Sequence, residues 1–106
     1  MMNFKKVIFA LNSDTRLRII QILDNCKNCG VMEILKNYTQ LYNPQIHRET
    51  IYRELEKLVD AGIVEKKYDT KNKKIYYELK IKKLKIDILK RKIFISNELE
   101  GEPNDG

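Results

Sequence analysis

The sequence predicts a mainly α-helical domain with a small β-hairpin. Apolar residues recur at helical spacing up to Gly62, and after it apolar and charged residues alternate as they do in strands. The 106 residues suffice for one hydrophobic core and are too few for two, so a single domain is expected. With 42% hydrophobic and 34% charged residues, the composition is that of a soluble globular protein rather than a disordered one.

Two helices are expected ahead of residue 26. The first covers residues 3–11, and Ser13 is a plausible N-cap for the second, which continues to about Asn25. Two lysines before the apolar run of the first helix faintly resemble a signal peptide, but no small-residue cleavage site follows. No apolar run approaches the length that crosses a bilayer. We therefore expect no membrane association and a cytoplasmic protein, whose amphipathic first helix has the apolar face Phe4, Val7, Ile8 and Leu11.

Two further helices are expected before the strands. The third covers residues 31–41, and Pro44 then forces a turn because it disfavours helical geometry at the residue before it. The fourth begins at residue 45 or 47 and ends at residue 61, where Gly62 suits a left-handed C-cap. Its apolar residues follow the spacing i, i+4, i+7, i+8 and form one buried stripe: Ile51, Leu55, Leu58 and Val59.

After Gly62 we expect two strands and a last helix. The stretches "IVEKKY" and "KIYYELK" are rich in β-branched and aromatic residues, and they flank "DTKNKK", which is typical of a hairpin turn. Residues 80–99 contain neither Gly nor Pro and predict a long final helix. The predicted domain therefore covers residues 1–99 in the order α-α-α-α-β-β-α, and the acidic tail at 100–106 is predicted to be disordered.

Positive charge is concentrated after Gly62. The chain has a net charge of +6, and residues 63–94 carry 12 basic and 4 acidic side chains. A strong local positive excess favours a polyanionic partner such as nucleic acid, although lysine-rich segments also occur simply as solvated surface.

Three helices followed by a basic hairpin form the skeleton of a winged helix-turn-helix protein, in which the helix of residues 47–61 enters the major groove of DNA. Its buried stripe turns the other face outward, where arginine can reach guanine edges or phosphates. Lysines of the wing, residues 63–79, would hold the phosphate backbone and add affinity more than specificity. The alternative for the outward helix face is a solvated surface with i, i+4 ion pairs. Candidate DNA contacts are His47, Arg48, Glu49, Thr50, Tyr52, Arg53 and Lys57 on the helix, and Lys71, Asn72, Lys73 and Lys74 on the wing.

Two stretches resemble known regulators. "LNSDTRLRIIQIL" resembles the "L-x-x-x-T-R-L-x-I-L-x-x-L" helix of ArsR-like winged-helix repressors, and "ETIYRELEKLVDAGIVEKK" with "KKIYYEL" looks like their recognition helix, glycine stop and wing. The second stretch also resembles "TVYR-x-L-x-x-L-x-x-x-G-L-V" of Fur-type regulators, and it is similar to MarR relatives. The resemblance implies a DNA-binding transcriptional regulator, usually a homodimer on a pseudo-palindromic site.

Two features depart from the ArsR-like pattern. The connection "KNYTQLYNPQIHRET" is longer than the tight turn that usually precedes the recognition helix. The cysteine pair with which many ArsR members bind metal in their third or fourth helix is also missing. Metal sensing by that route is therefore not expected.

Cys26 and Cys29 form a C-x-x-C motif at the end of the second helix. Three interpretations remain open: ordinary thiols, a disulfide or redox-responsive pair, and a metal half-site. A structural zinc site needs four ligands, whereas the chain offers two cysteines and one histidine, His47. No strand-then-helix thioredoxin pattern surrounds the motif, which argues against an oxidoreductase. No cofactor is expected.

The final helix is expected to carry two apolar stripes. One stripe can cover the core of the domain, and the other stays exposed unless a partner buries it. The economical partner is a second copy of the chain, packed with two-fold symmetry alongside the first helix. The alternative is that a small core needs both stripes. The predicted dimer interface comprises Phe4, Ile8, Ile86, Leu89 and Ile93.

The sequence offers no arrangement for catalysis. It has no paired carboxylates, Ser-His-Asp set or Cys-His pair at a defensible spacing, and no phosphate-binding glycine loop, so we do not expect an enzyme. The predicted function is a homodimeric regulator that binds specific double-stranded DNA, acting as a repressor on an operator. The alternatives are a winged-helix module that binds protein or RNA in a larger assembly, and a redox- or metal-responsive regulator that uses Cys26 and Cys29.

Overall fold

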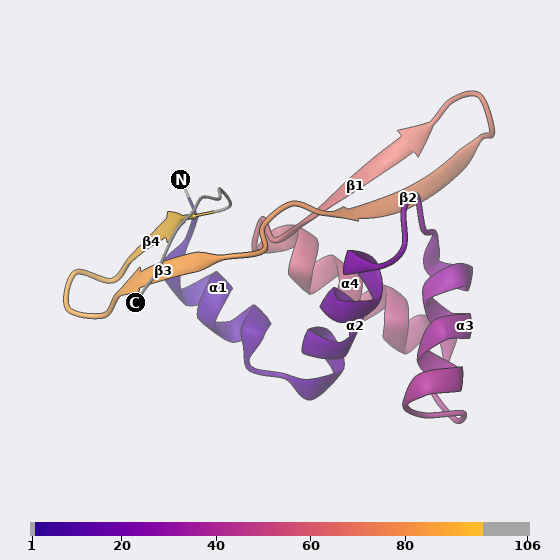
Figure 1. Ribbon diagram of the computed structural model, residues 1–106, viewed down its shortest axis with the longest axis horizontal. Coiled ribbons are helices and arrows are strands. Elements are labelled where there is room, and N and C mark those ends of the chain that lie inside the picture. Colours follow the sequence, from indigo (N-terminus) through magenta and orange to yellow (C-terminus); the bar gives the residue numbers. More distant parts are fainter. Residues whose placement is uncertain (1, 97–106) are drawn as a thin grey trace.

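The computed structural model describes residues 2–96, in which four helices are followed by two antiparallel β-hairpins (Figure 1). The four helices and the first hairpin confirm the predicted fold class. The helices are α1 (Phe4–Leu11), α2 (Asp14–Asp24), α3 (Val31–Leu41) and α4 (Arg48–Asp60). The strands are β1 (Val64–Asp69), β2 (Lys74–Leu79), β3 (Leu84–Asp87) and β4 (Lys92–Ile95).

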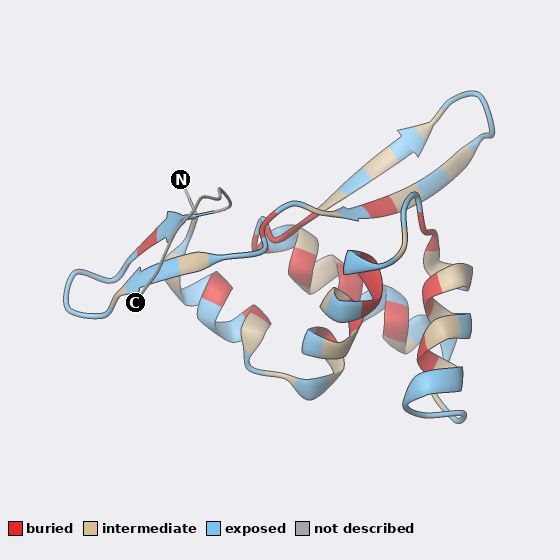
Figure 2. Cartoon of the chain, in the orientation of Figure 1, coloured by how far each residue is buried: buried red, intermediate tan, exposed pale blue. Residues whose placement is uncertain are grey.

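The core lies between the helices, and each helix contributes one apolar face to it (Figure 2). On α4 the predicted stripe is confirmed, because Ile51, Leu55 and Leu58 are fully buried. Ile19 of α2 and Ile34 of α3 are also fully buried. The helical period of the sequence therefore fixes which side of α4 faces solvent.

Arg16 joins three helices from inside the domain. Its side chain is 6% exposed and donates to the backbone carbonyls of Ala10 and Phe9, at 2.8 Å each, which satisfies the C-terminal end of α1. It also forms an ion pair with Glu54 of α4. A buried arginine needs such partners, because an unpaired buried charge would destabilise the domain strongly.

The hairpin of β1 and β2 is the predicted wing, and it projects from one end of the molecule (Figure 1). Gly62 has a φ of 82°, so the expected left-handed C-cap ahead of the wing is confirmed. At the tip, Asp69 Oδ1 accepts hydrogen bonds from the backbone N–H groups of Lys71 and Asn72. Lys73 then adopts a left-handed conformation with a φ of 52°, which turns the chain into β2.

The predicted final helix at residues 80–99 is wrong over its described part. Residues 84–95 form the hairpin of β3 and β4 instead, in which Leu84 pairs with Ile95 and Ile86 with Ile93. Apolar and charged residues alternate here, and isoleucine favours strands because of its β-branched side chain. Leu84, Ile86, Ile93 and Ile95, which a helix would divide between two stripes, therefore lie on one face of the hairpin. The end of the predicted helix and the predicted disordered tail, residues 97–106, lie outside the described residues.

No helix in residues 2–96 is long and apolar enough to cross a membrane.

Candidate nucleic-acid interface

The outward face of α4 is held in place by the buried face opposite to it. The helix begins at Arg48, after His47 as an exposed N-cap whose side chain makes no capping hydrogen bond. Arg48, Tyr52 and Arg53 are exposed on the first turns, as predicted from the sequence. Residues near the N-terminus of such a helix are the ones that reach base edges, and the free backbone N–H groups there favour a phosphate.

The wing lies against the same end of α4. Arg48 and Tyr52 of α4, together with Tyr68 and Lys73 of the wing, line one hollow of about 640 Å³. Lys66 of β1 fixes this arrangement, because its Nζ lies 3.1 Å from Glu56 Oε2 of α4 and 5.4 Å from the ring centre of Tyr52. The hydrogen bond to Glu56 raises the pKa of Lys66, so the lysine stays charged. The helix and the wing therefore form one continuous basic surface.

The basic residues of this surface fall into two groups. Lys66, Lys67 and Lys74 are each paired with a carboxylate of the same molecule. The side chains of four others form no ion pair or hydrogen bond with any residue between 2 and 96, and they remain available to an external anion. These are Arg48 and Arg53 on α4 and Lys71 and Lys73 at the wing tip.

Two of the predicted DNA contacts are engaged within the protein. Lys57 pairs with Glu54 of the same helix at 3.3 Å, and its Nζ lies 5.8 Å from the ring centre of Phe9 in α1. Lys74 pairs with Glu33 of α3 at 2.5 Å, and this contact lowers the pKa of the Glu33 carboxyl. Thr50 is half-buried, whereas Glu49 and Asn72 are exposed. Asn72 also donates a side-chain hydrogen bond to Asp69.

Sequence reasoning missed Tyr68 as a member of the surface. The alternation of β1 could have found it, because Lys66 and Tyr68 are two residues apart and share a face of the strand. Sequence reasoning also missed the Glu33–Lys74 pair, which joins residues 41 positions apart. No local pattern marks such a contact.

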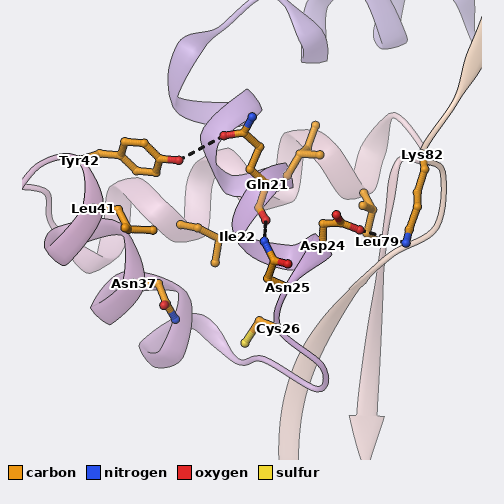
Figure 3. Close-up of a pocket in the computed structure, with 11 residues that line it drawn as sticks. Gln21, Ile22, Asp24, Asn25, Cys26, Asn37, Leu41, Tyr42, Leu79 and Lys82 are labelled. Atoms are coloured by element: carbon orange, nitrogen blue, oxygen red, sulfur yellow. Dashed lines mark hydrogen bonds and ion pairs between the residues drawn. The ribbon is translucent and has the colours of Figure 1, made fainter.

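Cys26 and Cys29 form a disulfide, with their Cα atoms 5.9 Å apart. Cys26 lines a hollow of about 570 Å³ between α2, α3 and the end of β2, shown in Figure 3. Within residues 2–96 no group of three or more His, Cys, Asp or Glu residues lies close enough to hold a metal ion. The described donor set therefore does not fit a transition metal, which requires such a cluster.

The predicted dimer residues separate into two groups. Ile93 is 9% exposed and belongs to the core, and Phe4 packs against that core. Ile8, Ile86 and Leu89 are 40%, 39% and 96% exposed and remain candidates for contact with a partner. The neighbouring Ile88 is 76% exposed.

Comparisons with known proteins agree on the type of fold. The sequence profile described as "FUR: Ferric uptake regulator family" matches residues 11–92. A solved structure described as "manganese uptake regulator" superposes with a TM-score of 0.57 at 17% sequence identity, covering 92% of this chain and 76% of that chain. At this identity the structural match establishes the fold alone. No curated protein matches the chain.

Proposed function

Because the chain belongs to the ferric uptake regulator family, a non-enzymatic family of DNA-binding transcriptional regulators, we propose that α4 reads a specific operator and the wing holds its backbone. The family match confirms the Fur-type resemblance of "ETIYRELEKLVDAGIVEKK", and it does not support the ArsR-like one. One observation carries the proposal: full burial of Ile51, Leu55 and Leu58 turns arginines outward beside the lysines of the wing tip, and no residue between 2 and 96 pairs with these basic side chains.

Each group of the surface has a distinct role. Arg48 and Arg53 read guanine edges in the major groove, and Tyr52 contacts a base or a phosphate beside them. Lys71 and Lys73 neutralise phosphates next to the groove, which adds affinity without sequence preference. His47, Glu49, Thr50 and Asn72 complete the predicted surface. Lys57 and Lys74 can reach DNA only if they leave their carboxylate partners, so we rank them below the others.

We further infer that two copies of the chain act together as a cytoplasmic repressor, with residues 1–99 as one domain. Exposed apolar side chains on α1 and the β3–β4 hairpin, namely Ile8, Ile86 and Leu89, suit contact with a second copy. Two-fold symmetry would place the two α4 helices in successive major grooves, about 34–36 Å apart. The operator is then expected to be pseudo-palindromic.

The experiment is selection of bound duplexes from a random pool, followed by binding of the selected sequence at several salt concentrations. Arg53→Ala should weaken binding by about 1–3 kcal/mol and relax specificity at one base pair. Lys85→Ala is the matched control, because it removes one exposed positive charge from β3, at the opposite end of the molecule (Figure 1). A protein that ignores every duplex at low salt, while it binds RNA or protein, would overturn the proposal.

A further inference from the structure

The C-x-x-C segment is bonded directly to the wing. Residues 26–29 connect α2 to α3, and the backbone N–H of Tyr77 in β2 donates to the carbonyl oxygen of Cys29 at 2.8 Å. The two residues form an isolated antiparallel bridge, and each is 1% exposed. The backbone of the cysteine motif therefore helps to position the central part of β2.

The residues after Cys29 strengthen this joint. A Cβ atom at Gly30 would lie 3.1 Å from the carbonyl oxygen of Ile75, so the start of α3 approaches β2 as closely as a glycine allows. Glu33 accepts a hydrogen bond from the N–H of Gly30 at 2.9 Å and also binds Lys74 of β2. The cysteine segment, the first turn of α3 and β2 therefore form one connected unit.

The disulfide can be reached from solvent at one sulfur only. Cys29 is buried, whereas Cys26 is half-buried and lines the hollow of about 570 Å³ (Figure 3). The hollow is large enough for a small organic molecule. Its rim carries the Asp24–Lys82 ion pair and the amides of Gln21 and Asn25, groups that match the carboxylate and amide groups of a peptide-like thiol.

Stabilisation of the folded protein is a weak explanation for the presence of the disulfide. A bridge that closes so short a loop removes little entropy from the unfolded chain. In a cytoplasmic protein, disulfides are rare and usually transient or redox-sensing. The hydrogen bond from Tyr77 to Cys29 gives this cysteine pair a direct connection to the wing.

We propose that Cys26 and Cys29 are a reversible redox site, reduced by a low-molecular-weight thiol that enters this hollow, and that the redox state controls the position of the wing. The inference rests on the proposed function, because the wing is the part that holds DNA. In the disulfide form the segment that accepts the hydrogen bond from Tyr77 is held in place, and the protein binds DNA with high affinity. In the dithiol form that segment can move, and the wing binds the DNA backbone more weakly.

The exchange is balanced in two steps. A thiolate of the incoming molecule attacks Cys26 Sγ, the disulfide breaks, and Cys29 leaves as a thiolate that takes a proton from water. A second thiolate attacks the sulfur of the bound small molecule, releasing the oxidised small-molecule disulfide, and Cys26 takes up a proton. Two electrons pass from two small thiols to the protein disulfide.

The test compares the wild-type protein, oxidised or treated with glutathione, by two readouts. Hydrogen exchange of the Tyr77 amide needs no DNA and should become about tenfold faster after reduction, because its partner segment opens locally. Affinity for the selected duplex should fall by at least about fivefold, the lower end of typical allosteric coupling.

Peptide mapping under limiting glutathione should find the mixed disulfide on Cys26 and not on Cys29. Amides of the β3–β4 hairpin serve as the internal reference.

Cys26→Ser provides the control variant. It should show the reduced values of both readouts and ignore oxidant, which separates the disulfide from oxidation of methionine. Equal Tyr77 exchange in the two states of the wild type, or a disulfide that resists millimolar glutathione, would overturn the inference. If the Tyr77 amide responds but no duplex binds in either state, the proposed function fails and the redox coupling to the wing stands.

Discussion

The two β-hairpins share one turn design and differ in what they present. In the wing, Asp69 caps the turn through its side chain, and Lys73, four residues later, is left-handed with a φ of 52°. In the second hairpin Asp87 accepts from the N–H of Lys90, and Arg91, again four residues later, has a φ of 55°. The backbone of each turn is thus set by the same spacing of an aspartate and a basic residue in the left-handed region.

The tips carry opposite chemistry on this shared backbone. Lys71 in the wing occupies the position that Leu89, at 96% exposed, holds in the second hairpin. A lysine at that position suits a phosphate backbone, whereas an exposed leucine suits an apolar partner. The hairpins also lie at opposite ends of the molecule, so they can serve different partners at once (Figure 1). The turn therefore sets the shape of each hairpin, and the residue at its tip sets the kind of partner that the hairpin suits.

The hairpins are also attached to the body of the protein in different ways. The wing is held by polar and apolar contacts together: the Lys66–Glu56 pair and the bond from Tyr77 to Cys29 are polar, and the side chains of Val64 and Tyr77 lie in the core. The second hairpin is held mainly by apolar side chains, since Ile93 lies in the core and Leu84 packs against it. Val64 and Tyr77 anchor the base of the wing, whereas its outer part is held by polar contacts such as Lys74–Glu33. Polar contacts can be exchanged for contacts with DNA or water, so the outer part of the wing is the better candidate for movement.

The largest expected effect comes from the tip of the second hairpin. Leu89→Asp would place a charge in the proposed dimer contact and should turn the dimer into a monomer, measured by light scattering. Affinity for a full operator should then fall by about a hundredfold or more, because the two sites no longer bind together. Lys71→Asp, at the matching position of the wing, should leave the dimer intact. A wild-type protein that is already monomeric would contradict this use of the hairpin.

The next effect tests how the hairpins are attached. Ile93→Ala should lower the free energy of unfolding by about 2–5 kcal/mol, because it opens a cavity in the core. Ile75→Ala, on the half-exposed face of the wing, should cost less than about 1 kcal/mol. Urea unfolding of both variants at one protein concentration measures the difference. Similar losses would show that Ile75, in the outer part of the wing, is packed as firmly as Ile93.

A matched pair of charge removals tests which hairpin contacts DNA. Lys73→Asn and Arg91→Asn each remove one positive charge, and both keep a residue that tolerates the left-handed conformation. Lys73→Asn should reduce the slope of log affinity against log salt by about 0.9, the value for one phosphate contact. Arg91→Asn should leave the slope unchanged. The opposite result would assign DNA contact to the second hairpin.

The smallest expected effect is the acid titration of the wing turn. The side chain and the backbone of Asn72 donate to Asp69, and these hydrogen bonds lower the pKa of its carboxyl below the ordinary value. The lowered pKa means that this stabilisation is complete above about pH 4 and is lost as the pH falls through the folded pKa. The chemical shift of the Asn72 amide should follow this transition. In Asp69→Ala the transition should be absent, and a persistent one would belong to another group.

Local sequence signals determined the helical part of the protein and the wing. The 3.6-residue period of α4 was sufficient to place Ile51 and Leu55 inside, because a helix puts such residues on one face wherever it packs. Gly62 and the aspartate-lysine turn likewise act within a few residues of the chain. These features follow from backbone geometry and short-range hydrogen bonds, so the sequence by itself predicts them.

Tertiary contacts decided the rest. Residues 80–96 contain neither Gly nor Pro, which is compatible with a helix, and their apolar and charged residues alternate, which is compatible with strands. The hairpin is the arrangement that places Ile93 in the core. Lys74 was predicted to contact DNA, yet it meets Glu33, and Cys29 meets Tyr77 across 48 positions of the sequence. Such pairs form only when packing brings distant segments together, and that packing is a property of the whole core rather than of any local pattern.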